Sequence, residues 1–142
     1  MQSLVGVCIC YTFLMNIIES AKALGLPPES YVVVGSSVMV VLGLAKSDDD
    51  VDLTVTRELF ERFKKDGWRQ ELYGDEPLLK NGIYDVGAHF YKWEVSDLLE
   101  DALWIDEVPF ISLRKLLEWK RHMMRPSDIP QLKIIEDYLA EH

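Results

Sequence analysis

Cysteine and positive charge are both scarce in this chain. Only two of the 142 residues are cysteine, Cys8 and Cys10, and both lie near the N-terminus. They cannot build a disulfide framework, and no Cys or His pair lies near them to complete a zinc site. We therefore expect a reduced, cytoplasmic protein. The net charge of −9 argues against a large nucleic-acid surface, because phosphate backbones need clustered Lys and Arg.

Charge is also absent from the first eighteen residues, which are mostly apolar. No Lys or Arg precedes this apolar run and no small-residue cleavage pattern follows it, which disfavours a signal peptide. The run is shorter than the roughly 20 residues that a membrane-spanning helix needs. We expect no membrane attachment. We expect Met15 to be the true start, with residues 1–14 an upstream extension or a short strand or helix packed on the core.

The rest of the composition is that of an ordinary globular protein, with 49% hydrophobic and 27% charged residues. No internal repeat or low-complexity tract interrupts it. A chain of 142 residues can bury one sizeable core but not two independent ones. We expect a single domain over residues 1–142, which ends in helices over residues 112–142.

Hydrophobic spacing predicts a mixture of strands and helices. A helical pattern covers residues 14–24, a β-branched run at residues 31–34 predicts a buried strand, and alternation over residues 50–55 predicts a half-buried strand. Further strands are predicted at residues 68–73, 82–91 and 108–111, a loop at residues 74–77, and helices over residues 59–67 and after the possible caps Ser96, Ser112 and Ser127. This pattern favours an α+β fold, with a short mixed β-sheet covered on one face by helices.

Two aspartates stand out in the predicted strand over residues 50–55. Asp50 and Asp52 point to the same side, with Cα atoms roughly 6.5 Å apart. Carboxylates this close repel each other unless a cation lies between them, and Mg²⁺ prefers such oxygen ligands, usually shared with substrate phosphate. Asp85 is the best candidate for a third carboxylate in a two-metal site, because of its place in the alternation over residues 82–91. The alternative interpretation is a solvated acidic turn over residues 48–52.

A second element follows the predicted strand over residues 31–34. Gly35 and Ser36 could open a helix whose free N–H groups receive phosphate. Gly would let the backbone approach the ligand closely, and Ser would supply a short hydroxyl donor. The alternative is a β-hairpin in which residues 31–34 pair with residues 38–42, since the valines of the second arm favour a strand.

Gly35-Ser36, thirteen intervening residues and then Asp50-Val51-Asp52 together resemble the signature of the DNA polymerase β-like nucleotidyltransferase superfamily. The stretch VVVGSSVMVVLGLAKSDDDVDLTV is similar to its small bacterial branches, which include antibiotic nucleotidyltransferases and toxin-type enzymes of abortive-infection systems. Those branches often show a Gly-Ser turn, an apolar helix ending in Gly-Leu, a Thr or Ser, and then Asp-x-Asp. The matching positions here are Gly35 to Ser37, Gly43-Leu44, Ser47, Asp50 and Asp52.

The resemblance extends over roughly residues 28–135 and is strongest at residues 31–55. The third carboxylate of the family lies in an apolar-Asp-apolar setting, which Tyr84-Asp85-Val86 fits. Many members carry a Lys and then an Arg-x-Lys-Asp-like segment before a closing helix. Here Lys120 and residues 125–128 resemble that segment, with Ser127 in place of the usual Lys and Gln131 in place of a frequent acid.

The resemblance implies a nucleotidyltransferase-like fold and an enzyme that moves NMP from NTP to a hydroxyl-bearing acceptor with release of pyrophosphate. Asp50, Asp52 and Asp85 would be the catalytic, metal-binding carboxylates for Mg²⁺ or Mn²⁺. Asp85 would bind the second metal or take the proton of the acceptor. The implied nucleotide-binding residues are Gly35, Ser36, Ser37, Lys120 and Arg125.

Several alternatives stay open from the sequence. The acceptor could be a small molecule, an RNA end or a protein side chain, and the family suggests a helical protein partner or a homodimer. A rival interpretation is a catalytically inactive nucleotide- or partner-binding module, and another is an interaction protein whose acidic turn binds nothing. Lys120 and Arg125 also fit solvated charges at a helix C-terminus. His89 shares the predicted face of Asp85, but a lone His on a strand is more often structural.

Overall fold

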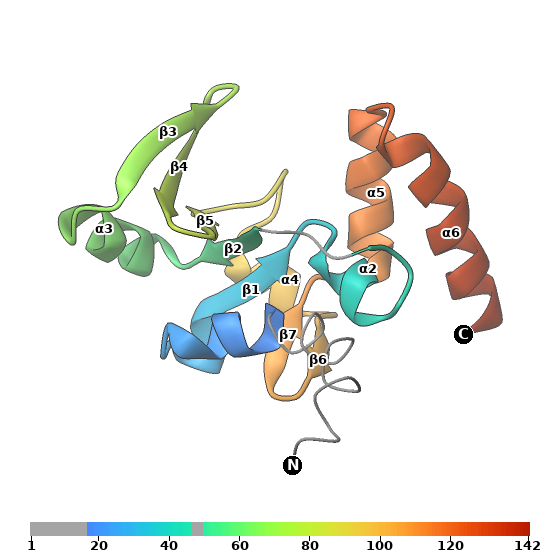
Figure 1. The fold of residues 1–142 in the computed structure, drawn as a ribbon, viewed down its shortest axis with the longest axis horizontal. Coiled ribbons are helices and arrows are strands. Elements are labelled where there is room, and N and C mark those ends of the chain that lie inside the picture. The colour runs from blue at the N-terminus through green and yellow to red at the C-terminus, as the bar shows by residue number, and fades with distance from the viewer. Residues whose placement is uncertain (1–16, 47–49) are drawn as a thin grey trace, which may run out of the picture.

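A seven-stranded mixed β-sheet organises the computed structural model, which describes residues 17–46 and 50–142 (Figure 1). The expected start at Met15, and residues 1–14 before it, lie outside the described residues. The order of strands across the sheet is β3-β4-β5-β2-β1-β7-β6. The strands are β1 (Tyr31–Val34), β2 (Val51–Val55), β3 (Arg69–Tyr73), β4 (Glu76–Asn81), β5 (Tyr84–Gly87), β6 (Leu103–Ile105) and β7 (Val108–Phe110).

The strands β5, β2 and β1 form the middle of the sheet. β2 runs antiparallel to β1 and parallel to β5, while β1 runs parallel to β7. The outer pairs β3–β4, β4–β5 and β6–β7 are antiparallel. All four residues of β1 are buried, as expected for an interior strand that is covered on both faces.

The helices lie around this sheet. Residues 17–23 are helical, which confirms the described part of the first predicted helix. No helix in the described part of the chain is long and apolar enough to cross a membrane. The other helices are the short 3-10 turn η2 (Pro28–Ser30), α2 (Ser37–Val41), α3 (Arg57–Lys65), α4 (Val95–Leu99), α5 (Leu113–Met123) and α6 (Asp128–Glu141).

Contacts of Tyr84 identify the helices on one face of the sheet. Its hydroxyl donates to the carbonyl oxygen of Ser20 at 2.7 Å. Its ring lies 6.1 Å from that of Trp68, which in turn packs at 4.4 Å against Phe63 of α3. α4 packs against β1 and lies behind it in Figure 1, whereas residues 17–23 lie in front. The prediction that helices cover only one face is therefore wrong, although the α+β class with a mixed sheet is confirmed.

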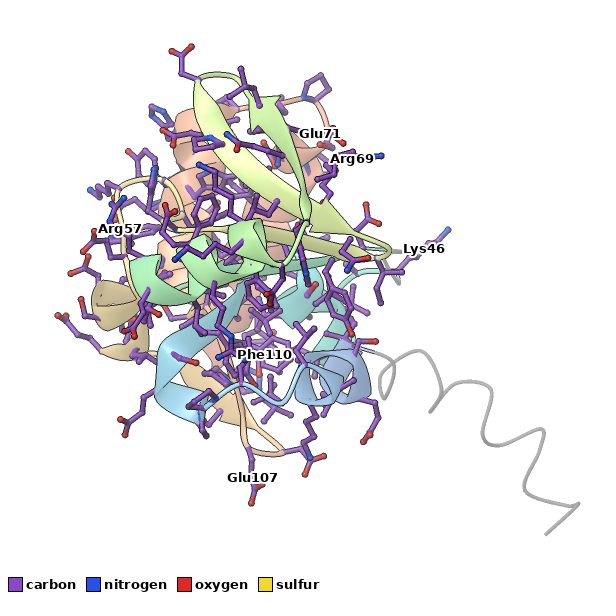
Figure 2. The ribbon with its side chains drawn as sticks, turned by 90° about the vertical axis from the view of Figure 1, so that its left-hand side faces the viewer. Lys46, Arg57, Arg69, Glu71, Glu107 and Phe110 are labelled. Carbon is purple, nitrogen blue, oxygen red and sulfur yellow. The ribbon has the colours of Figure 1, made fainter. Side chains whose placement is uncertain are left out.

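A single hydrophobic core joins the sheet to the helices. Phe110 of β7 is fully buried and lies inside the molecule in Figure 2, whereas Glu107 in the adjoining turn projects at its edge. Leu116 of α5 and Ile135 of α6 are also fully buried in this cluster. The C-terminal helices are thus part of the one core and not an appendage.

The predicted strand and loop boundaries need correction around the β3–β4 hairpin. The loop expected at residues 74–77 is only the turn, because Glu76 and Pro77 already belong to β4. β4 was not predicted, because Pro77 and Gly82 are typical of loops and favoured a loop for the segment between them. The strand expected over residues 82–91 is shorter, Tyr84–Gly87, and β6 was also not predicted.

Side-chain caps follow the sequence signals only in part. Ser112 accepts a hydrogen bond from the backbone N–H of Lys115, which confirms it as the cap of α5. Ser96 does not cap α4, because Glu94 occupies that position and forms a reciprocal capping box with Asp97. Ser127 precedes α6 but its side chain makes no capping hydrogen bond.

Candidate functional site

The turn after β1 leads directly into α2. Gly35 adopts a φ of 75°, a left-handed conformation that favours glycine. Ser36 is the N-cap residue and α2 begins at Ser37, so the alternative of a β-hairpin over residues 31–42 is wrong. The side chain of Ser37 is buried, with 2% of the residue exposed, whereas Ser36 is half-buried. Of the two serines, only Ser36 therefore faces outward from the turn.

The turn lies against the second aspartate of the Asp-x-Asp motif. Val34 at the end of β1 pairs with Asp52 of β2, which brings Gly35 beside the aspartate. A Cβ added to Gly35 would lie 3.0 Å from Oδ2 of Asp52, a tight contact that would displace the carboxylate by a few tenths of an ångström. Glycine thus leaves room for the close approach of the Asp52 carboxylate to the backbone of the turn. The two sequence motifs are neighbours in the fold, as predicted.

Asp85 lies beside Asp52 on the neighbouring strand. The two residues are paired in register between the parallel strands β2 and β5, so their side chains leave the same face of the sheet. Neighbouring strands lie about 4.8 Å apart. This face is opposite to the one that carries Tyr84. Asp50 immediately precedes β2 and is exposed.

Lys80 of β4 continues this row of charged residues. Lys80 pairs with Asp85 across β4 and β5, and its Nζ donates to Oδ1 of Asp85 at 3.0 Å. The hydrogen bond to Asp85 raises the pKa of Lys80, and the charges of Asp85, Glu71 and Asp50 add to this effect. Sequence reasoning missed Lys80 because it lies in the strand that was not predicted. No local sequence signal could have found it, because its contact with Asp85 depends on the register between β4 and β5.

A buried ionic cluster attaches the C-terminal helices to the Gly-Ser turn. Nζ of Lys120 donates to Oγ of Ser36 at 3.0 Å and to Oδ1 of Asp128 at 3.1 Å. Asp128 also accepts from Nε of Arg125 at 2.8 Å and from its Nη2 at 3.0 Å. The side chains of Lys120 and Asp128 are 1% and 0% exposed. Lys120 is therefore not a solvated charge at a helix end, contrary to that alternative.

Electrostatics in this cluster favour the ionised carboxylate. Hydrogen bonds from Arg125 and Lys120 hold the pKa of Asp128 well below its usual range. The hydrogen bond to Asp128 raises the pKa of Arg125, whereas burial lowers the pKa of Lys120. Arg125 also packs over the Trp119 ring, with its guanidinium carbon 4.6 Å from the ring centroid. Arg125 is thereby fixed in place while part of its side chain stays exposed.

A cavity of about 490 Å³ opens beside this cluster, between α2 and the C-terminal helices. Both cationic and apolar side chains line it. Lys46 at its rim projects away from the molecule in Figure 2. Its lining residues are Ser36, Val40, Leu44, Ala45, Lys46, Lys120, Arg125, Ser127, Pro130, Gln131 and Ile134.

A larger cavity of about 680 Å³ lies at the other end of β2, beside α4. It is bordered by Val55, Trp104, Arg57 and two glutamates, Glu29 and Glu94. None of the predicted site residues lines it. We therefore place the candidate site at the Gly35 and Asp52 end of the strands, where Gly35 adjoins Asp52 and Ser36 contacts Lys120.

The carboxylate oxygens at this site are ligands of the kind that Mg²⁺ prefers. Mg²⁺ is usually held by one or two carboxylates, with water and substrate phosphate completing its shell. Asp52 and Asp85 supply two such carboxylates from neighbouring strands. Among the described residues, no group of three or more His, Cys, Asp or Glu side chains is arranged to hold a metal ion. The assignment of all three residues, Asp50, Asp52 and Asp85, as metal ligands stays a prediction.

His89 lies outside β5, in the loop that follows it. Its Nε2 is 2.6 Å from Oε2 of Glu76, and its Nδ1 is 3.2 Å from the carbonyl oxygen of Tyr91. These contacts connect the loop to the β3–β4 hairpin. They support the structural interpretation of this histidine.

Comparison of the chain with protein-family models, with curated proteins and with solved structures finds no match. The resemblance to the nucleotidyltransferase superfamily therefore rests on the sequence of this chain alone.

Proposed function

We propose that this protein is a metal-dependent nucleotidyltransferase that moves NMP from NTP to a hydroxyl-bearing acceptor and releases pyrophosphate. The observation that carries the proposal is that groups from three neighbouring strands lie beside one another. The Gly35 turn ends β1 beside Asp52 of β2, which is in register with Asp85 of β5. The DNA polymerase β-like superfamily, which the sequence resembles, combines the same groups.

Each side chain has a role that its environment supports. Backbone N–H groups and the Ser36 hydroxyl at the turn bind the nucleotide phosphates, and Lys120 keeps Ser36 oriented through their 3.0 Å hydrogen bond. Asp50 and Asp52 orient Mg²⁺, which when bound neutralises charge on phosphate oxygens. Arg125, which borders the cavity with its charge fixed by Asp128, contributes positive charge toward the phosphates. Asp85 takes a second metal or accepts the proton of the acceptor hydroxyl.

Asp50 and Asp52 can be tested directly by nucleotide labelling. We expect Mg²⁺-dependent labelling of an acceptor when the protein is incubated with each α-labelled NTP, with cell extract as the acceptor pool. Asp50→Asn and Asp52→Asn keep the size and polarity of the side chain but remove its charge and one acceptor oxygen. Both variants should fold and label no acceptor above background.

Asp66→Asn is the matched control for these variants. Asp66 is exposed at the end of α3, so its substitution removes the same charge away from the site. This variant should label as the unsubstituted protein does. Undiminished labelling by Asp50→Asn and Asp52→Asn would rule out the assignment.

The inactive nucleotide-binding module is a second candidate, and the ion pair between Lys80 and Asp85 favours it. A lysine held on Asp85 occupies the carboxylate that transfer would need for a second metal or for the acceptor proton, whereas Asp50 and Asp52 could still bind Mg²⁺ with a nucleotide. In that case, NTP with Mg²⁺ would raise the melting temperature without producing any labelled acceptor. Labelled acceptor would exclude this candidate.

A further inference from the structure

A row of three charged residues crosses three strands at the candidate site. Lys80, Asp85 and Asp52 are paired in register across β4, β5 and β2, so their side chains leave the same face of the sheet. The Lys80 side chain is 30% exposed and that of Asp85 is 17% exposed. Their ion pair is thus partly shielded from water. A charge interaction in such a place is stronger than in bulk solvent.

We propose that Lys80 is a built-in competitor for the divalent cation: its ammonium occupies Asp85 and must move away before a metal ion can share that carboxylate with Asp52. This inference rests on the metal site of the proposed function and adds a residue that sets its affinity. The Nζ atom lies 3.0 Å from Oδ1 of Asp85, within the space that a metal bound to that oxygen would need.

The charges explain why the lysine and the metal exclude each other. A divalent cation on Asp85 would lie next to an ammonium group only a few ångströms away, and like charges at such distances repel strongly. Lys80 has a flexible four-carbon stem, so its ammonium can turn toward solvent or toward bound phosphate without moving β4. The lysine therefore prevents the carboxylates from holding a metal tightly when no phosphate is present to receive its ammonium.

Mn²⁺ binding without nucleotide tests this role. The loss of the free Mn²⁺ signal in electron paramagnetic resonance would be measured for the full chain and for Lys80→Met at one pH and one salt concentration. We expect Lys80→Met to bind Mn²⁺ roughly tenfold more tightly than the unsubstituted protein. This is the ratio expected when the charge-assisted hydrogen bond from Lys80 to Asp85 no longer competes with the metal. Lys80→Gln serves as a second variant, with the same expectation, if the methionine variant does not fold.

Two further variants locate the effect. Lys64→Met removes an exposed lysine of α3 and should leave Mn²⁺ affinity unchanged, which controls for net charge. Adding Asp85→Asn to Lys80→Met should remove the gain. The proposal is overturned if Lys80→Met binds no more tightly than the unsubstituted protein, if the gain survives Asp85→Asn, or if no form binds Mn²⁺.

This result is independent of nucleotide transfer. If Lys80→Met gains affinity but no labelled acceptor forms, the metal site and the competitor stand while the proposed transfer fails. If transfer occurs and Lys80→Met shows no gain, only the role of Lys80 fails.

Discussion

Lys120 and Asp128 place two opposite charges where water hardly reaches, and the partly exposed Arg125 also pairs with Asp128. Asp128 is fully buried and accepts hydrogen bonds from both cations. A buried ion pair adds little net stability, because desolvation offsets the attraction, but removing one partner leaves an uncompensated buried charge. The main role of this cluster is therefore to fix how the C-terminal helices pack against the Gly-Ser turn.

Removal of the carboxylate should be costly. We predict that Asp128→Ala lowers the free energy of unfolding by about 3–5 kcal/mol, because it leaves the Lys120 ammonium buried without its partner. Asp137→Ala is the matched control, since Asp137 pairs with Lys133 on the exposed surface of α6 and should change stability by less than about 1 kcal/mol. Urea denaturation of both variants measures the difference. Equal losses would show that the buried cluster does not stabilise the fold.

The same carboxylate makes stability depend on pH. The pKa of Asp128 is lowered in the folded protein, so the folded state binds this proton less readily than the unfolded state does. The stabilisation is fully present above the unfolded pKa of about 3.9 and is lost as the pH falls below it. We predict that the free energy of unfolding decreases below about pH 4 more steeply for the unsubstituted protein than for Asp128→Asn. Parallel curves from urea denaturation between pH 2 and 6 would contradict this.

The turn between β1 and α2 depends on glycine for two separable reasons. Gly35 and Gly43 adopt nearly equal φ angles, 75° and 77°, so alanine should strain the backbone similarly at both positions, by about 1–2 kcal/mol. Only at Gly35 would the new methyl group meet another group, the Asp52 carboxylate. We predict that Gly35→Ala abolishes acceptor labelling and Gly43→Ala does not. Labelling and urea denaturation of both variants test this, and equal labelling would show that the approach to Asp52 is unimportant.

Local sequence signals were sufficient for the elements at the centre of the fold. The β-branched run of β1 and the alternation of β2 predicted both strands, but burial does not follow a period of two in either: all four residues of β1 are buried, and in β2 every residue except Asp52 is buried, so β2 is not the half-buried strand expected. β4 and β6 were not predicted, because Pro77 is the second residue of β4 and β6 has only three residues. Both strands are stabilised by pairing with their neighbours in the sheet, which no local pattern records.

The contacts of the candidate site likewise include some that local sequence signals predict and some that they do not. Asp52, Asp85 and the Gly35 turn could be predicted, because their relation depends on strand alternation and on a glycine-dependent turn. The contact of Lys80 with Asp85 depends on the register between β4 and β5. The hydrogen bond of Lys120 to Ser36 joins residues 84 positions apart, so only the packed structure reveals it.

The structure shows one hydrophobic core among the described residues, and it includes residues of the first helix, the sheet and α6. We therefore predict a single cooperative unfolding transition, as small single domains usually show. Fluorescence of the four tryptophans and far-UV circular dichroism should give the same midpoint in urea. Two separate midpoints would show that the C-terminal helices form an independent unit.

The position of the label in the nucleotide tests the central claim most directly. The purified protein would be incubated with Mg²⁺, an acceptor pool and the same NTP labelled at either the α- or the γ-phosphate. Transfer of NMP predicts that the acceptor gains the α-label only, that the γ-label appears in pyrophosphate, and that Asp52→Asn gives neither product. An acceptor that carries the γ-label, or Asp52→Asn protein that labels as well as the unsubstituted chain, would contradict the account.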